Sequence, residues 1–142
     1  MKRIGVIDGQ GGGIGSAIIK KLKDEFAETI EIMALGTNAI ATAQMLKAKA
    51  NRGASGENAI VQTAGSLDVI VGPVSIIIAN AMMGEMTPKM AQAVADSSAK
   101  KFLLPLSKEN VVMVGLAAIP LPQLVEILIE RHLHFLHDEL NK

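Results

Sequence analysis

Residues 4–15 read Ile4-Gly5-Val6-Ile7-Asp8-Gly9-Gln10-Gly11-Gly12-Gly13-Ile14-Gly15, and this stretch decides the fold. The apolar residues 4–7 predict a short buried strand, and the glycines after Asp8 predict a loop. Apolar side chains at helical spacing then predict a helix from about Ile14 to Glu28. A strand, a glycine loop and an amphipathic helix in this order indicate the first unit of a parallel α/β sheet.

The same alternation continues along the chain. The further predicted strands are residues 30–35, 68–71, 102–106 and 111–116. The further predicted helices are residues 39–50, 56–64, 74–83, 88–97 and 122–140, with Thr37 or Asn38 placed to cap the first of them and Thr87 to cap the fourth. Only residues 107–110 separate the last two strands, which is too short for a helical crossover, so we expect an antiparallel hairpin at the sheet edge.

This order of elements predicts a single domain over residues 1–142. Its fold class is α/β: a Rossmann-like three-layer sandwich, with a doubly wound and mostly parallel sheet of about five strands that carries an edge hairpin. Right-handed crossovers should place the first helix on one face of the sheet and the middle helices on the other.

The composition excludes several classes of function. Lys and Arg (14) balance Asp and Glu (14), so we expect no nucleic-acid partner and no anionic membrane surface. The chain has no Cys, Trp or Tyr, which excludes thiol chemistry and a catalytic tyrosine. No targeting segment is visible, and the longest uncharged run, residues 69–84, is shorter than the roughly 18–20 residues of a membrane span, so a cytoplasmic location is expected.

The mean hydropathy of +0.35 is high for a soluble monomer of this size. Either the core is unusually rich in Ala and Ile, or a subunit interface is buried. We expect a homo-oligomer, and the sequence leaves the two explanations open.

The glycine loop is the segment with the clearest chemistry. Glycines let the backbone approach a ligand closely, and the helix that follows points free N–H groups and its positive dipole end at the same place. Such a loop after the first strand predicts a site for a phosphate or carboxylate, and the candidate cofactor is a nucleotide or dinucleotide. The alternative is a tight strand–helix turn that binds nothing.

Other turn residues at the same sheet edge could complete this site for a small-molecule ligand. The candidate binding residues are Asp8, Gly9, Gln10, Gly11, Gly12, Gly13, Ile14, Gly15, Thr37, Asn38, Gly72, Pro73 and Ser75. Asp8 could accept a bond from a ligand hydroxyl, hold Mg²⁺ through water, or satisfy the amides of its own loop. Asn38 stands where dinucleotide-binding folds carry an acidic residue for the ribose, and no Lys-Ser/Thr pair follows the glycines as in a P-loop.

The spacing of Gly9, Gly13 and Gly15 resembles the cofactor loop of the short-chain dehydrogenases, with Asp8 where those enzymes usually carry Thr. The resemblance covers about twelve residues and implies a ligand site. Those enzymes also use a Tyr-x-x-x-Lys pair, and this chain has no Tyr. The activity of that family is therefore not expected.

Two other groups of residues, the methionines and the histidines, have the chemistry of a binding site. Met82, Met83, Met86 and Met90 predict core packing, with an apolar ligand wall or a dimer contact as alternatives. The three histidines, His132, His134 and His137, lie near the C-terminus and favour solvated side chains over a metal site. We therefore expect no bound metal, and no residue is identified as catalytic.

Several longer stretches identify a family resemblance. They are residues 6–15, 34–38, 56–60, 70–73 and 84–90. They resemble an uncharacterised bacterial protein family that is catalogued as a domain of unknown function. The resemblance implies no activity, but it draws attention to Asn58, Glu85 and Thr87 as pocket residues.

Three functions follow as hypotheses. The first is a module that binds a nucleotide or another anionic metabolite at residues 9–15. The second is a small enzyme with an active site between subunits, to which Asp8, Asn58 and Glu85 would contribute. The third is a structural or partner-binding subunit whose glycine loop is vestigial.

Overall fold

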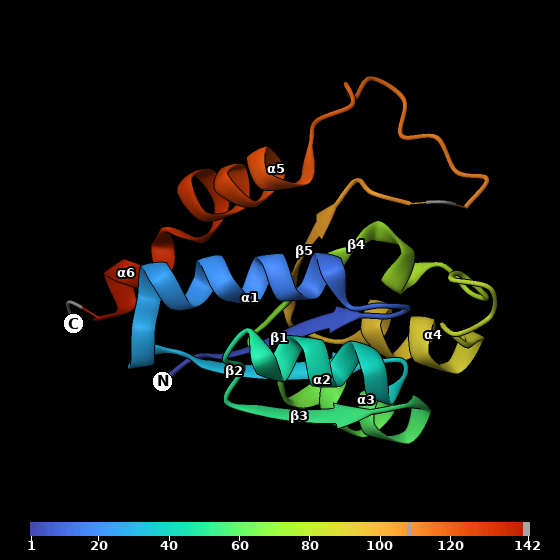
Figure 1. Ribbon diagram of the computed structural model, residues 1–142, viewed down its shortest axis with the longest axis horizontal. Coiled ribbons are helices and arrows are strands. Elements are labelled where there is room, and N and C mark those ends of the chain that lie inside the picture. The colour runs from blue at the N-terminus through green and yellow to red at the C-terminus, as the bar shows by residue number, and fades with distance from the viewer. Residues whose placement is uncertain (108, 141–142) are drawn as a thin grey trace.

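The computed structural model describes residues 1–107 and 109–140 (Figure 1). In these ranges the chain forms one sheet of five parallel strands: β1 (Arg3–Asp8), β2 (Glu31–Gly36), β3 (Arg52–Ser55), β4 (Val69–Pro73) and β5 (Lys100–Leu104). The α-helices are α1 (Gly13–Phe26), α2 (Ala39–Lys47), α3 (Glu57–Thr63), α4 (Pro88–Asp96), α5 (Leu121–Ile127) and α6 (Phe135–Leu140).

The strand order is β3-β2-β1-β4-β5, so the chain winds outward from β1 in one direction and then returns to wind outward in the other. Helices α1, α2, α5 and α6 cover one face of the sheet, and α3 and α4 cover the other (Figure 1). The predicted α/β class with a three-layer, Rossmann-like arrangement is confirmed. Reversal of the winding places a topological switch point between the carboxyl ends of β1 and β4.

Two apolar clusters hold the layers together. The cluster under α1 includes Ile18, Leu22 and Ile32, each fully buried, and the cluster under α3 and α4 includes Ile60 and Ile70, also fully buried. Strands with apolar residues on both faces fit a sheet that helices cover on both sides. Within the described ranges, no helix is long and apolar enough to cross a membrane.

The predicted edge hairpin is wrong. Residues 111–116 form no strand, and β5 pairs in parallel with β4. In the connection that follows β5, the Glu109 Oε1 accepts a hydrogen bond from the Met82 N–H at 2.8 Å. This bond holds the connection beside Met82 and away from β5. The apolar, β-branched run at 111–116 was indistinguishable in sequence from an edge strand.

The predicted helix over residues 74–83 is also wrong. A short 3₁₀ helix, η3 (Val74–Ile77), is followed by a compact loop in which Asn80, Met82 and Met83 have positive φ angles. The Asn80 N–H donates to the Met86 carbonyl at 2.7 Å and closes this loop. Positive φ ends a right-handed helix, and apolar composition does not reveal it.

Two further differences concern β3 and the last helix. Strand β3 was missed because all of its side chains are exposed and its sequence has no buried apolar alternation. The predicted last helix is broken into α5, the π-helix η4 (Leu128–Leu133) and α6. The helix starts were predicted better: the Asn38 side chain caps α2 and Thr87 caps α4.

A substitution at Gly72 tests the close approach of β1 and β4. A Cβ atom there would collide with the Ile7 carbonyl oxygen, which is backbone and cannot move aside. We expect Gly72→Ala to lower the free energy of unfolding by about 1–3 kcal/mol, measured by urea denaturation. Gly65→Ala is the matched control, because a Cβ at Gly65 meets no atom within 4 Å. Equal midpoints for the two variants would contradict this account of Gly72.

Candidate functional site

A cleft of about 520 Å³ opens at the switch point, at the carboxyl ends of β1 and β4. Among the predicted residues, those that line it are Asp8, Gln10, Ile14, Pro73 and Ser75. Its remaining wall comes from Met82, Met83, Leu106, Ser107 and Glu109. The cleft therefore lies where open α/β sheets bind ligands, and its volume suits a small molecule.

Asp8 holds the glycine loop in place. Its carboxylate accepts hydrogen bonds from the Gly9 N–H at 2.8 Å and from the Gly15 N–H at 2.7 Å, and the residue is 4% exposed. Burial raises the pKa of Asp8, and the negative charge of Glu85 acts in the same direction, while the loop amides oppose the shift. The structure therefore shows Asp8 as an acceptor for the amides of its own loop, one of the roles expected from the sequence.

The glycines Gly9, Gly12, Gly15 and Gly72 are packed closely against other parts of the chain. A Cβ at Gly9 would lie 2.5 Å from the Thr37 hydroxyl oxygen, and one at Gly15 would lie 2.5 Å from the Met45 sulfur. Gly12 has a φ of 74° and lies against the backbone of Ala41. None of these four glycines is among the residues that line the cleft.

Gly11 and Gly13 are different. Both are exposed, neither has a positive φ, and a Cβ on either would meet no atom within 4 Å. Their N–H groups have no hydrogen-bond partner among the described residues. Gly11 and Gly13 do not line the cleft themselves, but in the sequence they lie between the lining residues Gln10 and Ile14. Neither the conformation nor the packing of the chain requires glycine at these two positions.

Glu85 occupies the other side of the loop, next to β2. Its Oε1 accepts hydrogen bonds from the Thr37 hydroxyl at 2.6 Å, the Asn38 side-chain amide at 2.7 Å and the Gln10 N–H at 2.9 Å. Partial burial would raise the pKa of Glu85, but these three donors outweigh it and lower that pKa. Thr37 and Asn38 thus face Glu85, and neither lines the cleft.

Ser75 contributes a hydroxyl to the cleft. The residue is 4% exposed, and it lines the cleft at the end of β4. A hydroxyl that lines a cleft can donate a hydrogen bond to, or accept one from, a group that enters it.

Glu109 and the methionine loop form the opposite wall. Glu109 accepts from the Met82 N–H and, through Oε2, from the Ser107 hydroxyl at 3.1 Å. Met82 and Met83 both have positive φ, and Met83 is 96% exposed at the mouth. Sequence reasoning missed Leu106 and Glu109, because the expected hairpin placed them in a different element.

The other candidates lie elsewhere. Asn58 is exposed on α3, and the Thr87 hydroxyl donates to Glu57 at 2.6 Å, so neither joins Asp8 in the cleft. Met86 and Met90 pack in the core under α4. His137 pairs with Glu25 at 2.9 Å, and the described residues hold no group of three His, Cys, Asp or Glu side chains arranged to bind a metal.

A family model described as "Domain of unknown function (DUF3842)" matches residues 3–137. The chain belongs to this family. The match confirms the resemblance predicted from the longer stretches of sequence. No curated protein matches the chain. The family description names no activity, so function must be argued from the cleft.

The Glu85 network makes a pH prediction. Because the pKa of Glu85 is lowered from 4.5, its ionised form stabilises the fold above that pH, and this contribution is lost as the pH falls through the folded pKa. We expect Glu85→Gln to lower the free energy of unfolding by about 1 kcal/mol at pH 7, where neutral bonds replace charge-assisted ones. The difference from the wild type should shrink below pH 4.5, as measured by urea denaturation at several pH values.

Asp8 acts with the opposite sign, because a raised carboxyl pKa favours the folded state as the pH falls. Glu85→Gln removes only the last of the causes of that shift, the repulsion from the Glu85 charge, and the burial that dominates it stays. Glu126→Gln removes the same charge from an exposed position on α5 and should leave the stability at pH 7 unchanged. A difference that persists unchanged at low pH would show that charge on Glu85 is not what stabilises the network.

Proposed function

We propose that the protein binds a phosphorylated small metabolite of mononucleotide size, with its phosphate at Gly11 and Gly13 and its body in the cleft. The observation that carries the proposal is the pair of open glycines. Their amides point to no acceptor among the described residues, and bare backbone there serves the close approach of a ligand.

The position of the two glycines at the start of α1 supports the proposed site for the phosphate of the ligand. Gly12 is the N-cap and Gly13 the first residue of a helix of 14 residues, whose dipole favours an anion at this end. Asp8 already takes the Gly15 amide, so a phosphate would bond to the outer amides of Gly11 and Gly13.

The body of the ligand is constrained by the lining of the cleft. Asp8 and Glu109 supply carboxylates, and Ser75 and Ser107 supply hydroxyls. Among residues 1–107 and 109–140, no Lys, Arg or His lines the cleft. Carboxylates accept bonds from hydroxyl or amino groups, as on a ribose, while Met82 and its apolar neighbours suit a flat ring. A hydroxylated body with one phosphate at the rim fits this distribution of charge.

The size of the ligand follows from Glu85. Dinucleotides lie across both sides of the switch point and reach the end of the second strand. Here Glu85 already bonds to the Thr37 hydroxyl and the Asn38 amide at that place. A mononucleotide needs only the side between β1 and β4, so we favour it over a dinucleotide.

Binding can be measured by thermal unfolding with AMP, GMP, CMP, UMP, ribose 5-phosphate, NAD and inorganic phosphate, with adenosine as the ligand that lacks phosphate. A ligand at about 100 times its Kd should stabilise the fold by about 2.7 kcal/mol, which raises the Tm by several degrees. We expect such a shift with a mononucleotide or ribose 5-phosphate, and a smaller one with NAD or adenosine.

Variants locate the site. Gly13→Val should abolish the shift, because its side chain would fill the place of the phosphate, while the open space around Gly13 lets the variant fold. Gly65→Val is the control at an equally open position. Ser75→Ala should weaken binding by about 5–10-fold, the loss of one hydrogen bond. The proposal fails if no phosphorylated ligand shifts the Tm, or if Gly13→Val binds as the wild type does.

A further inference from the structure

The connection from β5 to α5 exposes an unusual amount of apolar surface. Val112 and Val114 are 82% and 93% exposed, and Val111, Met113 and Leu116 are also exposed. Together these side chains present roughly 500 Å² of apolar surface, as much as the largest patch on a typical monomer. We call residues 111–116 the exposed segment. Figure 1 shows the connection that carries it arching away from the sheet before it returns to α5.

Residues 111–114 of the exposed segment have the composition of a strand without a strand partner. A turn overlaps their end, in which Gly115 has a positive φ and the Leu116 N–H donates to the Met113 carbonyl at 3.3 Å. Three of the segment's residues are valine, and β-branched side chains favour a pleated, half-buried surface. Its own β5 is not available to it as a hairpin, because the bond from the Met82 N–H to Glu109 pulls the preceding residues toward the cleft. The segment is therefore presented outward.

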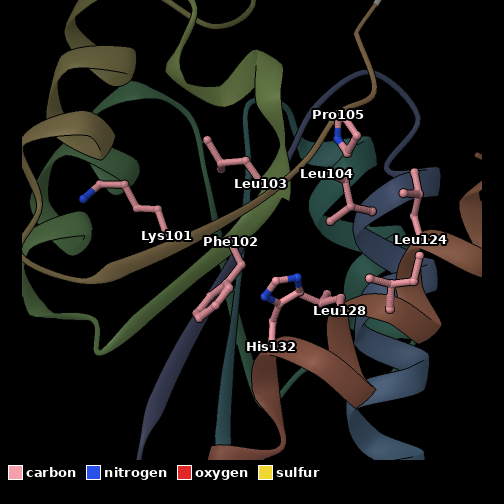
Figure 2. A pocket seen from close by; sticks show the side chains of 9 residues that line it. Lys101, Phe102, Leu103, Leu104, Pro105, Leu124, Leu128 and His132 are labelled. Atoms are coloured by element: carbon pink, nitrogen blue, oxygen red, sulfur yellow. The ribbon is translucent and has the colours of Figure 1, made fainter. Parts of the chain in front are cut away.

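A place for a strand exists on the same molecule. β5 is an edge of the sheet, and no described strand pairs with its outer side. A groove of about 360 Å³ runs along this edge, between β5 and the helices α5 and η4. Figure 2 shows Phe102 and His132 side by side in the groove, with Leu124 and Leu128 beyond them. Apolar side chains and an open row of backbone groups are what an added strand needs.

We infer that the exposed segment of one copy adds as a strand to the outer edge of β5 in a second copy, so that the chain forms a symmetric dimer. Each copy carries both the segment and the groove, and a twofold axis satisfies both pairs at once. The roughly 500 Å² of apolar surface on the segment lies below the roughly 800 Å² that each partner buries in a standard interface, and the covered part of the groove adds to it. The segment is apolar and has no charge, and the groove is lined mostly by apolar side chains with Lys101 and His132 among them.

The oligomeric state tests the inference directly. We expect the wild type to sediment as a dimer, and Val112→Lys combined with Val114→Lys to weaken the dimer by at least about 100-fold. Both side chains are exposed in the monomer, so the double variant should keep its circular dichroism spectrum. Ile40→Lys, at an apolar side chain on α2 that is 68% exposed, is the control and should remain dimeric. A monomeric wild type, or a dimer that the double variant leaves intact, overturns the inference.

Cross-linking identifies the surface that receives the segment. The chain has no cysteine, so Val112→Cys gives a single site for a benzophenone maleimide. Mixing labelled protein with ¹⁵N-enriched unlabelled protein separates cross-links between copies from those within one copy. We expect cross-links between copies to residues 101–105 or 124–132, found by mass spectrometry. Cross-links confined to one copy, or directed to another surface, overturn the inference. The ligand proposal is not involved in either experiment.

Discussion

The two hydrogen bonds from the Gly9 and Gly15 amides to Asp8 hold together the part of the molecule on which the site depends. They join the end of β1 to the first turn of α1, so that the helix begins directly above the strand. The Asp8 carboxylate is buried, and those amides offset part of the cost of its desolvation. The path of the loop, and with it the outward position of Gly11 and Gly13, follows from this arrangement.

Two acidic residues divide the amides of the loop between them. Asp8 takes those of Gly9 and Gly15, and Glu85 takes that of Gln10 together with the polar side chains at the end of β2. An anion that approaches the loop finds only the outer amides without an acceptor, and it must stay clear of both carboxylates. Repulsion from these acids weakens binding of a highly charged ligand, which favours one phosphate over a pyrophosphate.

The sequence predicted the features that arise from local chemistry. The α/β class, the loop between β1 and α1, and the caps at Asn38 and Thr87 follow from periodicity and turn residues. The features that the sequence did not predict are decided by contacts between residues that are far apart in the chain. Glu85 lies 75 positions after Gln10 in the chain, and the bond from Met82 to Glu109 turns an apparent strand into an exposed segment. β3 escaped notice because a strand with exposed side chains has no apolar pattern.

One connection contributes both to the cleft and to the proposed dimer. Residues 105–110 supply Leu106, Ser107 and Glu109 to the cleft wall, and the exposed segment follows directly. Docking of the exposed segment on a second copy would fix this connection at two places. The first is its bond to Met82, and the second is β5 of the other copy. If dimerisation orders this wall of the cleft, less conformational entropy is lost when the ligand binds, so its affinity for the dimer is higher. Thermodynamic linkage then requires the ligand to raise the affinity of the dimer by the same factor. The two proposals, if both hold, therefore imply that ligand binding and association reinforce each other.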